Sequence, residues 1–166
     1  MKTLLVQLFL ISTFISCSGE VEQKSAVEIY IQQVKESKYI ADTLPEFSPN
    51  DIPVILNSAN DFTVISKFPV NPLSSYGPTK FTVGECLLWT VENIRLHYGN
   101  YSGSNYFPSF VPELHIKNDV NSNSLNNSQL IEVYNLYFNW WYDNKGKDFS
   151  SFREKSPLSN SSYSWK

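Results

Sequence analysis

The segment that most restricts the fold is residues 82–99, TVGECLLWTVENIRLHYG. Apolar side chains recur there at helical spacing: Val83, Leu87, Val91, Ile94 and Tyr98. Other apolar residues fall outside this stripe, so a helix here is apolar on most of its circumference and must be enclosed by other elements. Thr82 and Glu85 are spaced as a capping box, and Gly99 suits a C-terminal stop. The sequence therefore predicts a central helix.

Two helices are predicted before this segment. The first covers residues 25–39, begins with a capping box of Ser25 and Glu28, and has one apolar face: Val27, Tyr30, Ile31 and Val34. The second begins near Asp51, because Pro53 removes a backbone hydrogen bond once a helix has passed its first turn. Its inward-facing residues are expected to be Ile52, Ile55, Leu56 and Ala59. Both helices offer an apolar face to the central one.

The last long helix is predicted to start at a cap on Asn127 or Ser128 and to stop at Gly146. Its expected buried stripe is Leu130, Tyr134, Tyr137 and Trp141. Its expected polar face is Glu132, Asn135, Asn139 and Asp143. Aromatic rings on this helix also suit stacking on sugars, although a core role is the default. Trp140 and Tyr142 belong least to the stripe and are the weak binding candidates.

The remaining segments are rich in turn-forming residues. Proline and glycine interrupt residues 62–80, which predicts a rigid loop there. Residues 113–116 suit a short strand and residues 148–158 a short helix. By length the mature chain is one domain. The sequence therefore predicts a mainly α fold, a single compact helical domain of about four to five helices with long Pro/Asn/Ser-rich loops.

The N-terminal segment has the order of a bacterial lipoprotein signal. Lys2 supplies a positive charge, residues 3–16 are mostly apolar, and the apolar run stops at Cys17. The run is shorter than the roughly 20 residues that a transmembrane helix needs. Phe14 and Ser16 depart from the commonest signal, which has Leu first and Ala or Gly before the cysteine. The alternative is an ordinary cleaved signal followed by a chance cysteine.

Lipidation of Cys17 divides the chain into a signal peptide, residues 1–16, a lipidated tether, residues 17–24, and a folded domain, residues 25–166. Each buried methylene of an acyl chain such as palmitate contributes about 0.8 kcal/mol, so several chains hold a protein at a bilayer. The expected location is the cell membrane or outer membrane, facing the periplasm or the cell surface. The net charge of −3 offers no attraction to nucleic acid.

Several segments carry a resemblance to a known family: YIQQVKESKY, LPEFSPNDIP, SANDFTVISKFPVNPLSS, GECLLWTVENIR and SPLSNSSYSW. Together they span most of the mature chain, and FPVNPLSS followed by LWTVENIR is the most specific pair. They resemble a lipoprotein family of gut-dwelling Gram-negative anaerobes that contains a domain of unknown function. The resemblance implies an outer-membrane or surface lipoprotein. It implies no activity and no catalytic residues.

The sequence offers few groups for metal or nucleophilic chemistry. The 2 histidines, His97 and His115, are distant in the sequence, and there is no H-E-x-x-H pattern and no paired cysteines. No metal and no cofactor are therefore expected. After lipidation of Cys17, Cys86 is the remaining cysteine, and its apolar neighbours predict a buried, inert thiol. The serines lack a G-x-S-x-G setting.

Two carboxylates on the central helix are candidates for acid–base catalysis. Glu85 and Glu92 share one helical face, and a carboxylate pair that flanks a glycosidic bond can cleave it. Glu85 also fits the capping box, and Glu92 is placed to pair with Arg95, so a structural contact is favoured over a ligand clamp. Separately, residues 42–44 resemble an O-glycosylation pattern of exported proteins in related anaerobes, with Thr43 as the acceptor.

These features predict a lipid-anchored cell-envelope protein that acts as a non-enzymatic binding or interaction module. Its partners are then the bilayer, through Cys17, and an envelope protein or glycan. One alternative is a small envelope hydrolase that acts on glycan or peptide through Glu85 or Glu92. Another is a purely structural envelope component. The discriminating observation is whether Glu85, Glu92 and His97 line one open cleft or lie apart.

Overall fold

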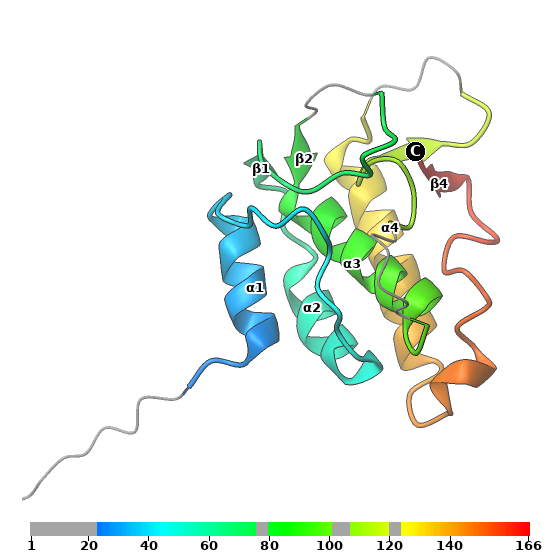
Figure 1. Ribbon diagram of the computed structural model, residues 1–166. Coiled ribbons are helices and arrows are strands. Elements are labelled where there is room, and N and C mark those ends of the chain that lie inside the picture. The colour runs from blue at the N-terminus through cyan, green and yellow to red at the C-terminus, as the bar shows by residue number, and fades with distance from the viewer. Residues whose placement is uncertain (1–22, 76–79, 101–106, 120–123) are drawn as a thin grey trace, which may run out of the picture.

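A computed structural model describes residues 23–75, 80–100, 107–119 and 124–166. The described residues form four α-helices: α1 Ala26–Lys35, α2 Ile52–Ser58, α3 Val83–His97 and α4 Asn127–Tyr142 (Figure 1). They also form two short 3-10 helices, η1 Pro49–Asp51 and η2 Phe149–Ser151, and four short strands: β1 Val64–Ile65, β2 Phe81–Thr82, β3 Leu114–Ile116 and β4 Tyr163–Trp165. The predicted signal peptide and Cys17 lie outside the described residues.

The expectation of a mainly α fold is wrong, because the domain is a mixed α/β structure. Strands β1 and β2 pair antiparallel, with Val64 opposite Thr82. Strands β3 and β4 also pair antiparallel, with His115 opposite Ser164. Strands of two or three residues are too short to show an alternating pattern in sequence, and both partners of each pair are distant along the chain. For that reason the prediction missed β4 and treated β1 as part of a loop.

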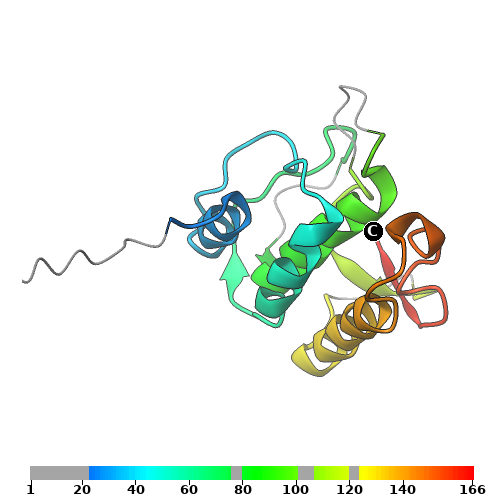
Figure 2. The same cartoon turned by 90° about the horizontal axis from the view of Figure 1, so that it is seen from below.

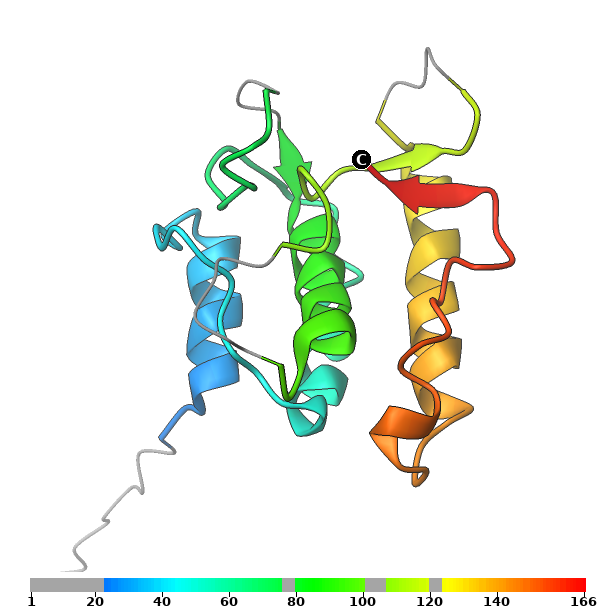
Figure 3. The same cartoon turned by 45° about the vertical axis from the view of Figure 1, so that its right-hand side comes forward.

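Helix α3 occupies the centre of the domain, as predicted. Every residue of α3 from Val83 to Arg95 is buried. Helices α1 and α4 lie on opposite sides of α3, and α2 packs against both α1 and α3 (Figures 2 and 3). The predicted inward faces of α1 and α2 are confirmed, since all of their named apolar residues are buried. The enclosure of α3 explains why a helix that is apolar on most sides is stable here.

The starts of α1 and α3 follow the predicted capping rules, whereas α1 and α4 end at Lys35 and Tyr142, about four residues earlier than predicted. The Ser25 hydroxyl accepts a hydrogen bond from the Glu28 amide, and Thr82 caps Glu85 in the same way. Gly99 has a φ of +82°, the left-handed conformation that ends a helix at the residue after its cap. The cap of α4 is Asn126, which pairs with Gln129 and precedes both predicted residues.

The buried face of α4 differs from the predicted stripe. The buried residues are Leu130, Val133, Tyr137 and Trp140. Tyr134 and Trp141 are only half-buried, so the prediction placed the face one residue too far along the helix. Apolar and aromatic side chains fill most of this helix, and a spacing rule alone fixes its orientation poorly. The polar face is confirmed, because Glu132, Asn135, Asn139 and Asp143 are exposed.

Candidate functional site

The carboxylate candidate Glu92 belongs to a buried network that joins α3, α4 and the C-terminal segment. Arg95 Nη2 lies 2.6 Å from Glu92 Oε1, and Arg95 Nε donates to Glu92 Oε2 at 3.0 Å. The Tyr137 hydroxyl donates to Glu92 Oε2 at 3.0 Å and accepts a hydrogen bond from Trp165 Nε1 at 2.8 Å. Arg95 Nη1 donates to the Arg153 carbonyl at 2.6 Å. Both oxygens of Glu92 are therefore occupied by structural partners.

The other carboxylate candidate, Glu85, holds the start of α3 against β3. Its Oε2 accepts hydrogen bonds from the Thr82 amide at 2.9 Å and the Thr82 hydroxyl at 2.8 Å. Its Oε1 accepts from the Leu114 amide at 3.3 Å. Burial raises the pKa of Glu85, and the hydrogen bonds from Thr82 oppose that shift. Glu85 and Glu92 are thus bound to different partners, at opposite parts of the helix.

The remaining sequence candidates have separate locations. His97 is in the last turn of α3, and His115 Nε2 lies 3.1 Å from Ser164 Oγ in the β3–β4 pair. Within the described residues, no group of three or more His, Cys, Asp or Glu side chains is placed to hold a metal ion. Burial raises the pKa of the Cys86 thiol well above its usual range, which matches the predicted inert thiol. Thr43 is half-buried.

The two aromatic candidates differ in exposure. Trp140 is only 8% exposed and packs against Phe152, with ring centroids 5.3 Å apart. Tyr142 is 37% exposed and stacks on Phe138, with centroids 4.2 Å apart. Of these two, only Tyr142 is accessible to a ligand at the surface.

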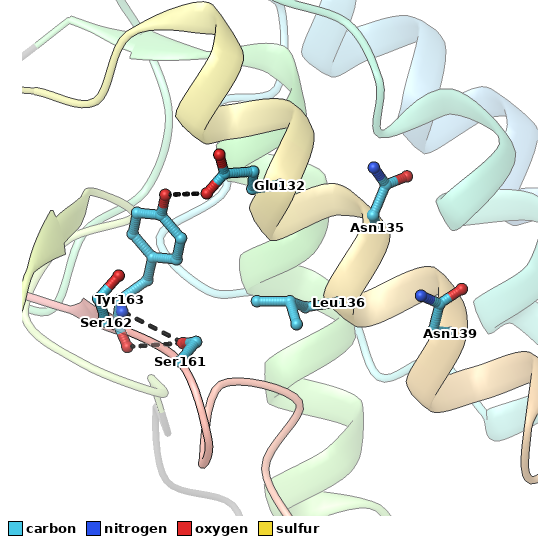
Figure 4. Close-up of a pocket in the computed structure, with 7 residues that line it drawn as sticks. All are labelled: Glu132, Asn135, Leu136, Asn139, Ser161, Ser162 and Tyr163. Carbon is cyan, nitrogen blue, oxygen red and sulfur yellow. Dashed lines mark hydrogen bonds between the residues drawn. The ribbon is translucent and has the colours of Figure 1, made fainter.

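A pocket that the sequence candidates do not include lies between α4 and the C-terminal segment (Figure 4). Its volume is about 390 Å³, within the range typical of small-molecule sites. Helix α4 contributes Glu132, Asn135, Leu136 and Asn139. The segment that leads into β4 contributes Ser161, Ser162 and Tyr163. We call this the α4 pocket.

The polar groups of the α4 pocket are positioned by its two walls. The Tyr163 hydroxyl donates a hydrogen bond to Glu132 Oε2, which ties the C-terminal segment to α4. Ser161 Oγ accepts from the Tyr163 amide at 3.1 Å and donates to the Leu158 carbonyl at 3.0 Å. Leu136 lies between these groups and the two asparagines (Figure 4). These hydrogen bonds therefore hold the turn before β4 in place against α4.

Asn135 and Asn139 are different, because their amides are not used by the fold. They lie one helical turn apart on the exposed side of α4, and neither side chain has a hydrogen-bond partner among the described residues (Figure 4). Each amide offers two donor hydrogens and an acceptor oxygen. Among the described residues, the lining contains one carboxylate, that of Glu132. The arrangement suits hydrogen bonding to a polar molecule.

Sequence reasoning missed the α4 pocket because one of its walls was not predicted. The residues on α4 were read as a solvent-facing polar face, which their exposure agrees with. This face becomes one wall of a pocket because the pairing of β4 with β3 places residues 161–163 opposite α4.

Comparison with known proteins gives one family match. A family model described as a domain of unknown function, DUF4943, matches residues 21–166. No curated protein and no solved structure gives a significant match to this chain. The site is therefore interpreted from its own geometry.

Proposed function

Because this chain belongs to the DUF4943 family of domains of unknown function, we propose its role from its own residues: a lipid-anchored protein of the cell envelope whose folded domain is a non-enzymatic binding module. The family match begins at residue 21, shortly after the proposed attachment point at Cys17. The binding site proposed for this module is the α4 pocket.

The lipid anchor is supported by the N-terminal sequence. An apolar run that follows Lys2 and ends at Cys17 has the order and length of a lipoprotein signal. In the part of the chain that the structure describes, no helix is long and apolar enough to cross a membrane. Several acyl chains on Cys17 provide a membrane affinity that one chain does not. The fold then stands at the bilayer surface on a short polar tether.

A binding role is supported by a contrast between two sets of polar side chains: one set forms hydrogen bonds within the fold, and the other lies at the surface. Glu85 and Glu92, the carboxylates best placed in sequence for catalysis, are each 5% exposed and fully engaged in structural hydrogen bonds. The amides of Asn135 and Asn139 line an open pocket and have no hydrogen-bond partner in the described part of the chain. This second observation carries the proposal, because unpartnered amides beside a concave surface can bind a ligand without any change in the fold.

The anchor is tested by growing cells with labelled palmitate and comparing the wild-type chain with the Cys17→Ala variant. Wild-type protein is expected to take up label and to fractionate with the envelope, whereas Cys17→Ala does neither. Cys86→Ala is the matched control, because it removes the buried cysteine and leaves the attachment point. Unlabelled wild-type protein, or a Cys17→Ala variant that stays with the envelope, contradicts the anchor.

The binding role is tested by thermal unfolding of the full chain in the presence of glycan, peptide and envelope-protein panels. A ligand at 100 times its Kd adds about 2.7 kcal/mol of stability and raises the melting temperature. The shift is expected to disappear in the double variant Asn135→Ala, Asn139→Ala and to persist in Asn57→Ala, an exposed asparagine on α2. A chain whose melting temperature responds to no panel contradicts the binding role.

A further inference from the structure

The charge of the α4 pocket limits the ligands that it can accept. The described residues of its lining include one carboxylate, Glu132, and no lysine, arginine or histidine. A phosphate or carboxylate group would meet a like charge there without a compensating cation. A ligand whose binding groups are neutral meets no such cost. The lining therefore favours a neutral, polar ligand over an anionic one.

The spacing of the two asparagines indicates the kind of neutral ligand. Four residues along an α-helix correspond to a rise of about 6 Å, comparable to the width of one pyranose ring. Each amide of Asn135 and Asn139 both donates and accepts hydrogen bonds, and so does each hydroxyl of a sugar. Neighbouring hydroxyls on one ring can pair with the donor and the acceptor of a single amide. The two amides thus match a row of hydroxyl groups.

Glu132 adds a strong acceptor in a fixed orientation. Its Oε2 accepts a hydrogen bond from the Tyr163 hydroxyl, and its Oε1 has no hydrogen-bond partner among the described residues. Burial and the contact with Glu132 raise the pKa of Tyr163 to about 12, so the hydroxyl stays protonated and keeps donating at neutral pH. The free oxygen remains available to accept from a ligand hydroxyl, which is a charge-assisted hydrogen bond.

An aromatic row lies next to the asparagines on the same helix. Tyr134, Phe138 and Tyr142 follow one another at intervals of four residues, with centroids 5.9 Å apart for the first pair and 4.2 Å for the second. Lys145 Nζ lies 5.7 Å from the centroid of Tyr142 and covers part of that ring. These three rings are not among the described residues that line the α4 pocket, so a sugar ring packs its C–H groups on them only where the ligand extends beyond the pocket.

From the charge of the lining, the two asparagine amides and the acceptor on Glu132, we infer that the α4 pocket binds a neutral saccharide through Asn135, Asn139 and Glu132. The assignment rests on the proposed binding function and names its ligand class. A peptide is the competing ligand, because backbone amides also pair with asparagine. It fits the pocket less well, since peptide specificity comes from apolar side-chain pockets and Leu136 is the one aliphatic residue in the lining.

The test uses the full chain in detergent micelles and titrations followed by ¹⁵N NMR, which detects millimolar affinity. The neutral probes are the tetrasaccharides of cellulose, starch, xylan, mannan and chitin, together with galactotetraose. Tetragalacturonate, an acidic analogue of galactotetraose, and tetra-alanine are the comparison probes. At least one neutral tetrasaccharide is expected to shift the side-chain amide signals of Asn135 and Asn139, whereas tetragalacturonate and tetra-alanine bind at least tenfold more weakly.

Variants test whether the saccharide binds at the α4 pocket or nonspecifically elsewhere on the protein surface. The double variant Asn135→Ala, Asn139→Ala is expected to weaken saccharide binding at least tenfold, and Asn57→Ala leaves it unchanged. Glu132→Gln keeps the shape of the lining and removes its charge, so the preference for the neutral tetrasaccharide that binds wild-type protein over tetragalacturonate should fall severalfold. Circular dichroism of each variant confirms that it is folded.

The outcomes separate the ligand class from the binding function. If tetra-alanine binds through the same asparagines at least as tightly as every saccharide, the saccharide assignment is overturned and the binding module stands. If no neutral tetrasaccharide binds, or if binding survives the double variant, the assignment is also overturned. The binding function itself fails only when the chain responds to none of the glycan, peptide and envelope-protein panels.

Discussion

The Glu92 carboxylate and the Arg95 guanidinium face each other in a two-pronged ion pair on α3, with Arg95 Nη2 2.6 Å from Glu92 Oε1 and Arg95 Nε 3.0 Å from Oε2. Both side chains are at most 7% exposed. The pair also receives the Tyr137 hydroxyl from α4 and donates to the Arg153 carbonyl in the C-terminal segment. It is therefore a junction of three parts of the fold.

Removal of one member of this pair is predicted to be strongly destabilising. Arg95→Met leaves the Glu92 carboxylate buried without its cation, which costs about 3–5 kcal/mol of unfolding free energy. The measurement is urea unfolding at pH 7. The matched control is Lys38→Met, which breaks the exposed Lys38–Glu36 pair and is expected to change stability much less, because solvent and salt screen that pair. If Arg95→Met were no more destabilising than Lys38→Met, the pair would not have this structural role.

The hydroxyl of Tyr137 is predicted to stabilise the folded domain. Tyr137→Phe removes a donor to Glu92 and the acceptor of the Trp165 indole N–H, both inside the domain. Glu92 Oε2 keeps its hydrogen bond from Arg95 Nε, but the Trp165 indole N–H loses its acceptor, and the loss costs about 1–3 kcal/mol. The hydroxyl of Tyr134, on the same helix, has no hydrogen-bond partner among the described residues, so Tyr134→Phe is expected to change stability by less than about 0.5 kcal/mol. Equal effects of the two substitutions in denaturant unfolding would argue against the network.

His115 is predicted to make stability fall as the pH falls below neutrality. Burial, and then the nearby charge of Lys166, lower the pKa of His115 in the folded state from 6.5. The unfolded chain therefore binds the proton first, so the contribution of His115 is complete above pH 6.5 and is lost as the pH falls through that value.

The expected result is that wild-type protein loses more unfolding free energy than His115→Gln between pH 7.5 and about pH 5.5. Glutamine retains a group that can contact Ser164 Oγ and does not titrate. The comparison of the two proteins removes the opposite effect of Glu85, whose raised pKa favours the folded state as the pH falls. Identical pH profiles for wild type and His115→Gln would contradict this assignment.

The helices were largely predictable from sequence, because their signals are local. Ser25 and Thr82 are followed three residues later by a glutamate, and the apolar residues after them repeat at helical spacing. Gly99 marks the end of α3 by its left-handed conformation. These signals act within a few residues and do not depend on distant contacts.

The strands and the candidate site were not predictable, because they depend on contacts between distant segments. Strand β4 forms only by pairing Ser164 with His115, which lies far earlier in the chain. Asn135 and Asn139 have the spacing of any solvent-facing helix surface, and they become part of a pocket only when Ser161 lies across from them. The sequence shows the amide groups of these two asparagines, but it does not show which residues lie beside them in the fold.

Gly84 is predicted to be required for the contact between α3 and the end of α2. A Cβ at position 84 would lie 2.4 Å from the Ala59 carbonyl oxygen, and the Gly84 amide donates to the Asp61 carbonyl at 2.7 Å. Alanine is favoured over glycine in a helix by about 1 kcal/mol, yet Gly84→Ala should destabilise the domain by a net of about 1–3 kcal/mol through this clash. Gly99→Asn is the control, because the position has no atom within 4 Å of a Cβ and needs only positive φ, which asparagine tolerates. Urea unfolding should show a larger loss of unfolding free energy for Gly84→Ala than for Gly99→Asn. The reverse order would mean that α3 and the end of α2 approach each other less closely.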